Sequence, residues 1–71
     1  MSGTWIVSAR IIDIEDVYQI KTFETYDYVT NIPLYGIFFL MNDGENLAEI
    51  FRDKGYRDVA FASRAKELMM G

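Results

Sequence analysis

Three carboxylates, Asp13, Glu15 and Asp16, lie between positions 13 and 16 and are the first side chains that could do chemistry. Together they could bind a divalent metal through oxygen, or act as a general acid and base. Carboxylates this close in sequence are also common in solvated turns, where Asp bonds to nearby backbone N–H groups. We favour the turn, and we predict no metal ligand and no catalytic residue here.

A second polar stretch runs from Asn42 to Asn46 and superficially suggests a calcium loop. An EF-hand loop needs oxygen ligands at positions 1, 3 and 5, Gly at position 6 and Glu at position 12, and the spacing here fails. Asp43-Gly44 is a strong signal for a hairpin turn, because Gly adopts positive φ without strain. We therefore predict a turn at 42–45.

The residue types needed for most other catalytic sites are missing. The chain has no histidine and no cysteine, so the commonest general base and the best zinc ligands are absent. Its three lysines lie in no recognisable motif, and its internal glycines are isolated, so no phosphate-binding loop is present. We predict that the chain is not an enzyme and binds no cofactor.

Charge narrows the choice of partner. The net charge is −4, which disfavours nucleic acid and anionic membranes, since both require clustered Lys and Arg. The longest apolar run, 37–41, is far shorter than the ~20 residues that span a bilayer, and the first residues do not resemble a signal peptide. We expect a cytoplasmic protein whose partner, if foreign, is basic.

Eleven aromatic residues are a large apolar content for 71 residues. We do not expect a single small core to bury all of them. The tyrosines and Phe23 between 18 and 35 could pack in the core, anchor a protein interface or stack on bases. Base stacking needs a basic groove, and Lys21 is the one basic residue nearby, so it is the least favoured of the three. The candidate interface residues are Tyr18, Phe23, Tyr26, Tyr28, Tyr35, Phe38 and Met69.

Periodicity predicts three strands in the first part of the chain. Residues 4–12 alternate with a period of two, and we predict one strand with Trp5, Val7, Ala9 and Ile11 on one face. Residues 17–29 have strand composition, with either a bulge near 22–24 or a bend between two shorter strands. Residues 34–41 are apolar at both parities, which predicts that this chain covers both faces, or covers one and a partner the other.

The second part of the chain is predicted to be a strand and a helix. Residues 46–52 fit either a helical stripe or a returning strand, and we take the strand because it gives 34–41 a partner. A helix is predicted from about Arg57 to Met70, capped by Asp53, with Arg64 and Lys66 facing water and an apolar stripe of Phe61, Ala65, Leu68 and Met69. The predicted fold is α+β: one domain over 1–71 with an antiparallel sheet of three to four strands and a C-terminal helix on one face.

Taken together, these features predict a small non-catalytic protein-binding module that self-associates. Such size, acidity and lack of catalytic residue types are loosely typical of accessory or inhibitor proteins of phages and mobile elements, although no motif supports this association. One alternative is a small-ligand site lined by Tyr18, Tyr26 and Tyr28. The other is a metal enzyme that uses the carboxylates of Asp13 and Asp16.

Overall fold

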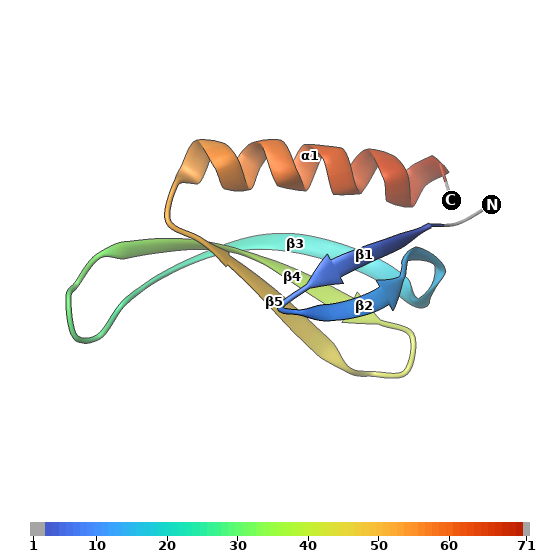
Figure 1. Ribbon diagram of the computed structural model, residues 1–71, viewed down its shortest axis with the longest axis horizontal. Helices are drawn as coiled ribbons and strands as arrows, with labels where there is room; N and C mark the ends of the chain where they lie inside the picture. Colours follow the sequence, from blue (N-terminus) through green and yellow to red (C-terminus); the bar gives the residue numbers. More distant parts are fainter. Residues whose placement is uncertain (1–2, 71) are drawn as a thin grey trace.

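Five strands and one long helix make up the part of the chain that the computed structural model describes, residues 3–70 (Figure 1). They form a two-stranded sheet, a three-stranded antiparallel sheet and a C-terminal helix packed on one face of the larger sheet, so the predicted α+β class is confirmed. In chain order the elements are β1 (Thr4–Val7), β2 (Arg10–Asp13), a 3-10 turn η1 (Ile14–Asp16), β3 (Val17–Tyr26), β4 (Pro33–Met41), β5 (Asn46–Phe51) and α1 (Lys54–Met70).

The larger sheet has the strand order β3-β4-β5, with β4 in the centre. The β4–β5 turn is the one that the sequence predicts: Gly44 has φ +89°, and the Asp43 carboxylate accepts a hydrogen bond from the Glu45 N–H at 2.9 Å. Residues 46–51 return as a strand, which confirms the hairpin over the helical alternative. The predicted turn at 13–16 overlaps η1, although Asp13 is the last residue of β2. The sequence also predicts a break at 30–33, and the observed connection covers 27–32, with Pro33 as the first residue of β4.

The prediction of one strand over 4–12 is wrong, because the chain reverses at Ser8-Ala9 and forms a hairpin. Both residues have positive φ, 50° and 65°, which is uncommon for side chains other than Gly, Asn or Asp. The reversal also changes which parity faces inward. Ile12 is buried in place of the predicted Ile11, which is 75% exposed.

The predicted limits of the next strand are wrong as well. The strand ends at Tyr26 and not at 29, since Asp27 begins a tight loop in which its C=O accepts a hydrogen bond from the Asn31 N–H at 2.8 Å. The bulge lies between Val17 and Gln19, not at 22–24. From Gln19 to Tyr26, β3 pairs with β4 without interruption.

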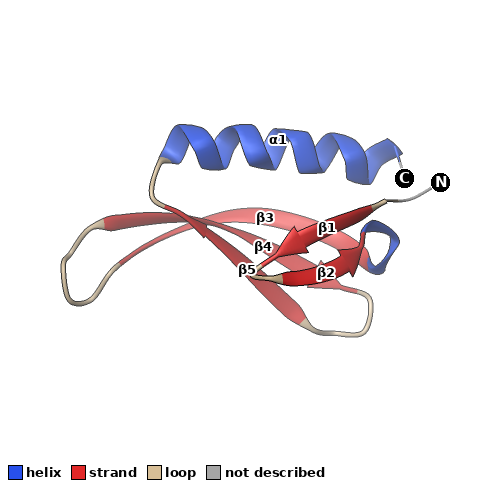
Figure 2. Cartoon of the chain, viewed as in Figure 1, coloured by secondary structure: helices blue, strands red, loops and turns tan. Residues whose placement is uncertain are grey.

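Helix α1 and the β1–β2 hairpin cover the same face of the larger sheet (Figures 1 and 2). The helix begins at Lys54, three positions before the predicted start, and Asp53 caps it by accepting the Tyr56 N–H at 3.0 Å. The buried apolar core joins the hairpin to β4 and consists of Trp5, Val7, Ile12, Ile14, Val17, Ile37, Phe39 and Met41. Phe61 and Leu68 of the predicted helix stripe pack against this core.

Two arginines on α1 are packed between the helix and the sheet. The prediction that Arg64 faces water is wrong, because its guanidinium bonds to both carboxylate oxygens of Glu49 on β5, at 3.2 and 3.1 Å. Arg57 is 3% exposed and reaches backbone carbonyls of β3 and β4. Met69, predicted to extend the stripe, is exposed at the end of the helix.

Candidate functional site

The second face of the larger sheet carries apolar side chains from all three strands, and we call it the open face. Neither α1 nor the β1–β2 hairpin lies on it, because both pack on the opposite side. Strand registers assign its side chains, since residues paired across antiparallel strands point to the same face. They are Gln19, Lys21, Phe23 and Thr25 on β3, Leu34, Phe38 and Leu40 on β4, and Asn46, Ala48 and Ile50 on β5, with Gly36 at the centre.

Two phenylalanines dominate the open face. The rings of Phe23 and Phe38 are stacked, with centroids 4.1 Å apart and planes at 22°. Phe38, in the middle of the central strand, is 36% exposed, and Ile50, which pairs with Gly36 near the end of β5, is 50% exposed. Lys21 is the only charged side chain on this face within residues 3–70. Exposed apolar surface with little charge is typical of a protein interface.

The ring of Phe23 lies directly over Gly36 on the neighbouring strand. A Cβ atom placed at Gly36 would collide with three atoms of that ring, so a side chain at this position excludes the observed stack. Gly36 therefore marks a close approach between the Phe23 ring and the backbone of β4 on the open face.

We predict that Gly36→Ala destabilises the chain by about 1–3 kcal/mol, because the new methyl group displaces Phe23. In a Phe23→Ala background the collision is gone, and the same substitution should become stabilising by up to about 1 kcal/mol, since Ala costs less entropy than Gly in a strand. Urea unfolding of the four proteins in this double-mutant cycle measures both effects. An equal cost of Gly36→Ala in both backgrounds would contradict the proposed contact.

The predicted interface residues fall in several places. Phe23 and Phe38 meet on the open face, whereas Tyr35 lies on the helix side, where the Arg57 guanidinium sits 5.6 Å from its ring centroid. The remaining predicted residues are exposed: Tyr26 and Tyr28 at the β3–β4 loop, Tyr18 at the bulge and Met69 on α1.

The open face also includes residues that the sequence did not single out as interface candidates. Leu34, Leu40, Ala48 and Ile50 belong to it through the strand register. The sequence signal that could have identified Leu34 and Leu40 is that residues 34–41 are apolar at both parities. The strand register that places Ala48 and Ile50 beside them could not be read from the sequence.

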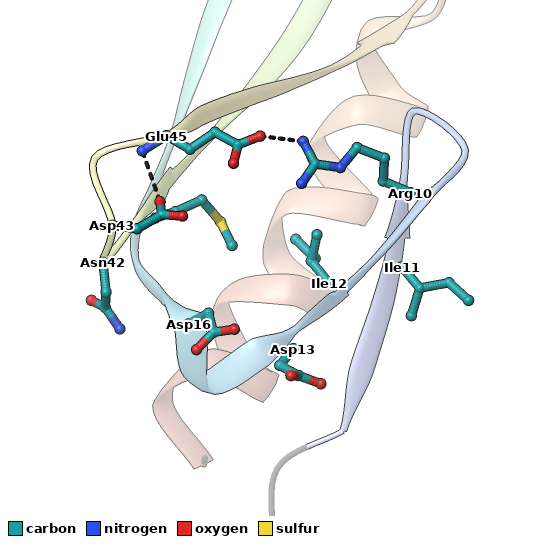
Figure 3. A pocket seen from close by; sticks show the side chains of 9 residues that line it. Arg10, Ile11, Ile12, Asp13, Asp16, Asn42, Asp43 and Glu45 are labelled. Atoms are coloured by element: carbon teal, nitrogen blue, oxygen red, sulfur yellow. Dashed lines mark hydrogen bonds and ion pairs between the residues drawn. The ribbon is translucent and has the colours of Figure 1, made fainter.

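A polar pocket lies between the β1–β2 hairpin and the β4–β5 turn (Figure 3). It has a volume of about 300 Å³, and Asp13, Asp16 and Asp43 contribute carboxylates around it. Arg10 and Glu45 form an ion pair across its side, which raises the pKa of Arg10. Within residues 3–70, no group of three or more His, Cys, Asp or Glu residues is placed to hold a metal ion.

No protein-family model, curated protein or solved structure matches the chain. Its own geometry is therefore the basis for a functional argument. In the part of the chain described, no helix is both long and apolar enough to cross a membrane.

The tyrosines proposed for a small-ligand site do not converge within one chain. Tyr18 and Tyr26 lie at opposite ends of β3, which places them about 27 Å apart at the usual rise per residue. Tyr28 joins Tyr26 alone, in an edge-to-face contact with ring centroids 5.8 Å apart. The geometry gives this alternative no support within a single copy.

Asp27 organises the loop beside these two tyrosines. Its carboxylate accepts hydrogen bonds from the N–H groups of Val29 (2.8 Å) and Thr30 (3.2 Å), which hold the pKa of Asp27 below its ordinary value of 3.8. The ionised form is thus favoured by folding, so the contribution of Asp27 to stability is present above pH 3.8 and lost as the pH falls through the lowered pKa.

We predict that an NMR titration of the Asp27 side-chain carboxyl carbon has its midpoint below 3.8, and that the loop amides of Val29 and Thr30 shift with the same midpoint. In Thr30→Pro, which removes both the N–H and the hydroxyl that Thr30 directs at Asp27, the midpoint should rise towards 3.8. A midpoint at or above 3.8 in the unchanged chain would show that these hydrogen bonds do not favour the ionised form.

Proposed function

We propose that this chain is a non-catalytic protein-binding module that self-associates, and that its open face contacts a protein partner. The observation that carries the proposal is the Phe23–Phe38 stack, in which Phe38 is exposed and Phe23 half-buried, together with the exposed Ile50, on a sheet face that nothing in residues 3–70 covers. Burying aromatic side chains of this size is a large source of interface energy. The cytoplasm remains our predicted location.

The chemistry of the open face defines the kind of partner surface that fits it. Its one charged side chain, Lys21, lies at the β3 edge, so most of the area offers apolar contact and Gln19, Thr25 and Asn46 offer hydrogen bonds at the margin. This surface favours an apolar partner with at most one matching carboxylate. The predicted preference for a basic partner therefore depends on the acidic side chains elsewhere and not on this face.

Site-specific photo-crosslinking tests the proposal. Benzoylphenylalanine replaces Phe38, and the chain is irradiated in cells of its native host. We expect protein adducts from position 38, because an interface residue is in van der Waals contact with the partner. The matched control is the same probe at Tyr56, an exposed aromatic residue on α1, away from the open face.

Adduct formation should also depend on the chemistry of the face. Ile50→Lys, which adds a charge beside Phe38 without touching the core, should reduce the yield from position 38 severalfold. Equal yields from positions 38 and 56, or no adduct from position 38, would refute the assignment of the open face.

A further inference from the structure

The larger sheet has two edges, and they differ in whether another part of the chain contacts them. At the β5 edge, the turn of the β1–β2 hairpin approaches closely enough for the Ser8 hydroxyl to donate to the C=O of Ala48 at 2.6 Å. The Arg10–Glu45 ion pair holds the same hairpin to the start of β5. At the opposite edge, β3 (Val17–Tyr26) pairs with β4 on its inner side, and no strand within residues 3–70 pairs with its outer side.

Arg57 reveals which backbone groups of β3 point outward. A single nitrogen, Nη1, donates to the carbonyls of Phe23 (3.0 Å) and Gly36 (3.3 Å), which are paired residues on β3 and β4. Both oxygens can approach one nitrogen only where the two carbonyls point toward the opposite strand, as in a hydrogen-bonded pair. Because this direction alternates along a strand, the outward N–H and C=O groups belong to Ile20, Thr22, Glu24 and Tyr26.

The small area of the open face is a reason for a second sheet to pair with the β3 edge. Three strands at the usual spacing of about 4.8 Å cover a width of about 14 Å, and the residues from Gln19 to Thr25 span about 23 Å. The resulting flat area, about 320 Å², is well below the ~800 Å² that each partner buries in a standard interface. A second sheet joined in the same plane would double it.

We propose that two copies of this chain pair antiparallel through their β3 edges, which makes one six-stranded sheet with a continuous open face. The inference deepens the proposed function, because it names the second copy and the edge through which the module self-associates. The two-fold axis passes at Phe23, so the two Phe23 side chains lie opposite one another and join the two Phe23–Phe38 stacks.

Charge and parity select this register. Residues opposite each other must share a face, and pairing centred on Lys21 or on Glu24 would place like charges directly opposite, which is destabilising. Pairing centred on Thr22 would place Lys21 against Phe23. Pairing centred on Phe23 instead places Lys21 opposite Thr25, Thr22 opposite Glu24, and Ile20 opposite Tyr26. Each pair then matches polar with polar or apolar with apolar side chains.

The absence of native cysteine permits a direct test with two single-cysteine chains, Lys21→Cys and Thr25→Cys. In the proposed register, positions 21 and 25 form a pair that is not hydrogen-bonded, with Cα atoms about 4.5 Å apart, within the range that a disulfide spans. Each variant alone keeps its two cysteines about 13 Å apart. Under a glutathione redox buffer, we expect a disulfide-linked dimer from the mixture and not from either variant alone.

Thr22→Pro tests the pairing without relying on cysteine. The Thr22 N–H points outward, so proline removes no hydrogen bond within the chain but removes two from the symmetric dimer, one donated by each copy. Sedimentation velocity should show a dimer for the unchanged chain and for Thr22→Val, and dimerisation weakened about tenfold or more for Thr22→Pro. Circular dichroism verifies that the proline variant is folded.

The outcomes separate this inference from the proposed function. A monomer at every concentration, or a disulfide in Lys21→Cys alone, would overturn the pairing or its register. Foreign-protein adducts from position 38 would still support the open face in that case. A mixed disulfide together with no adduct at position 38 would support the dimer and refute the open face as a binding surface.

Discussion

Arg57→Ala should destabilise the chain by about 3 kcal/mol, a large share of the roughly 4–11 kcal/mol expected for a domain of 71 residues. The Arg57 guanidinium is 3% exposed and connects α1 to two strands of the sheet through the carbonyls of Phe23 and Gly36. Its Nε also donates to Asp58 at 2.8 Å, and its plane lies over Tyr35. Alanine removes all of these contacts and leaves a cavity beneath the helix.

Urea unfolding followed by far-UV circular dichroism measures this loss of stability. Arg57→Met separates the contribution of packing from that of the hydrogen bonds. Methionine restores much of the packing but none of the hydrogen bonds, so it should recover part of the stability. Arg64→Ala is a matched comparison on the same helix, since Arg64 is less deeply buried and bonds to the half-buried Glu49. A change below 0.5 kcal/mol in Arg57→Ala would show that Arg57 does not hold the helix to the sheet.

Trp5→Ala should cost about 3–5 kcal/mol and leave much of the chain unfolded at 37 °C. Trp5 is 5% exposed and joins three elements: its ring meets Phe39 of β4 edge to face at 5.7 Å, and its Nε1 donates to Glu67 of α1 at 2.8 Å. The Arg64 guanidinium lies 5.3 Å from its ring centroid. We expect the loss of this side chain to weaken the packing of the β1–β2 hairpin on the rest of the core, which Val7 and Ile12 also contact.

Circular dichroism is the appropriate measurement, because Trp5 is the only tryptophan and its fluorescence disappears with it. Ile6→Ala is the matched control: Ile6 is the next residue of β1, but it points outward and is 67% exposed. We expect it to change the unfolding free energy by less than about 0.5 kcal/mol. Comparable losses in both variants would mean that the hairpin contributes through its backbone and not through Trp5.

The parts of the fold that followed from sequence were those with local chemical signals. Asp43-Gly44 specifies a turn whatever surrounds it, and Asp53 caps a helix through its own carboxylate. The choice of a strand for 46–51 rested on a simple requirement, that the apolar strand before it needs a hydrogen-bonding partner. These three features together predict the β4–β5 hairpin and α1.

The parts that failed depend on contacts between distant residues. Ser8-Ala9 carries no turn signal, and the alternation of apolar residues continues through it, so a hairpin reads as one strand. Arg64 was expected in water because it lies off the apolar stripe. Its partners, Glu49 and the rings of Trp5 and Phe39, are brought to it only by the folded sheet.

The sequence predicted that the candidate site is an apolar surface, but not which residues make it up. Residues 34–41 are apolar at both parities, and the structure covers one side of this strand with the chain itself and leaves the other side open. Phe23 and Phe38 were both singled out as interface candidates, although nothing in the sequence showed that their rings stack. Tyr35 was grouped with them by residue type, but strand parity places it under Arg57.

The hydrogen bond from Ser8 to Ala48 bears on how far assembly can proceed. Chains with two adhesive sheet edges add to one another without limit and grow into fibres, a hazard for a short, apolar sequence. Here the turn of the β1–β2 hairpin lies against the β5 margin at Ala48. In the proposed dimer, each outer margin would carry this contact, so we expect the N-terminal hairpin to disfavour the addition of a third molecule.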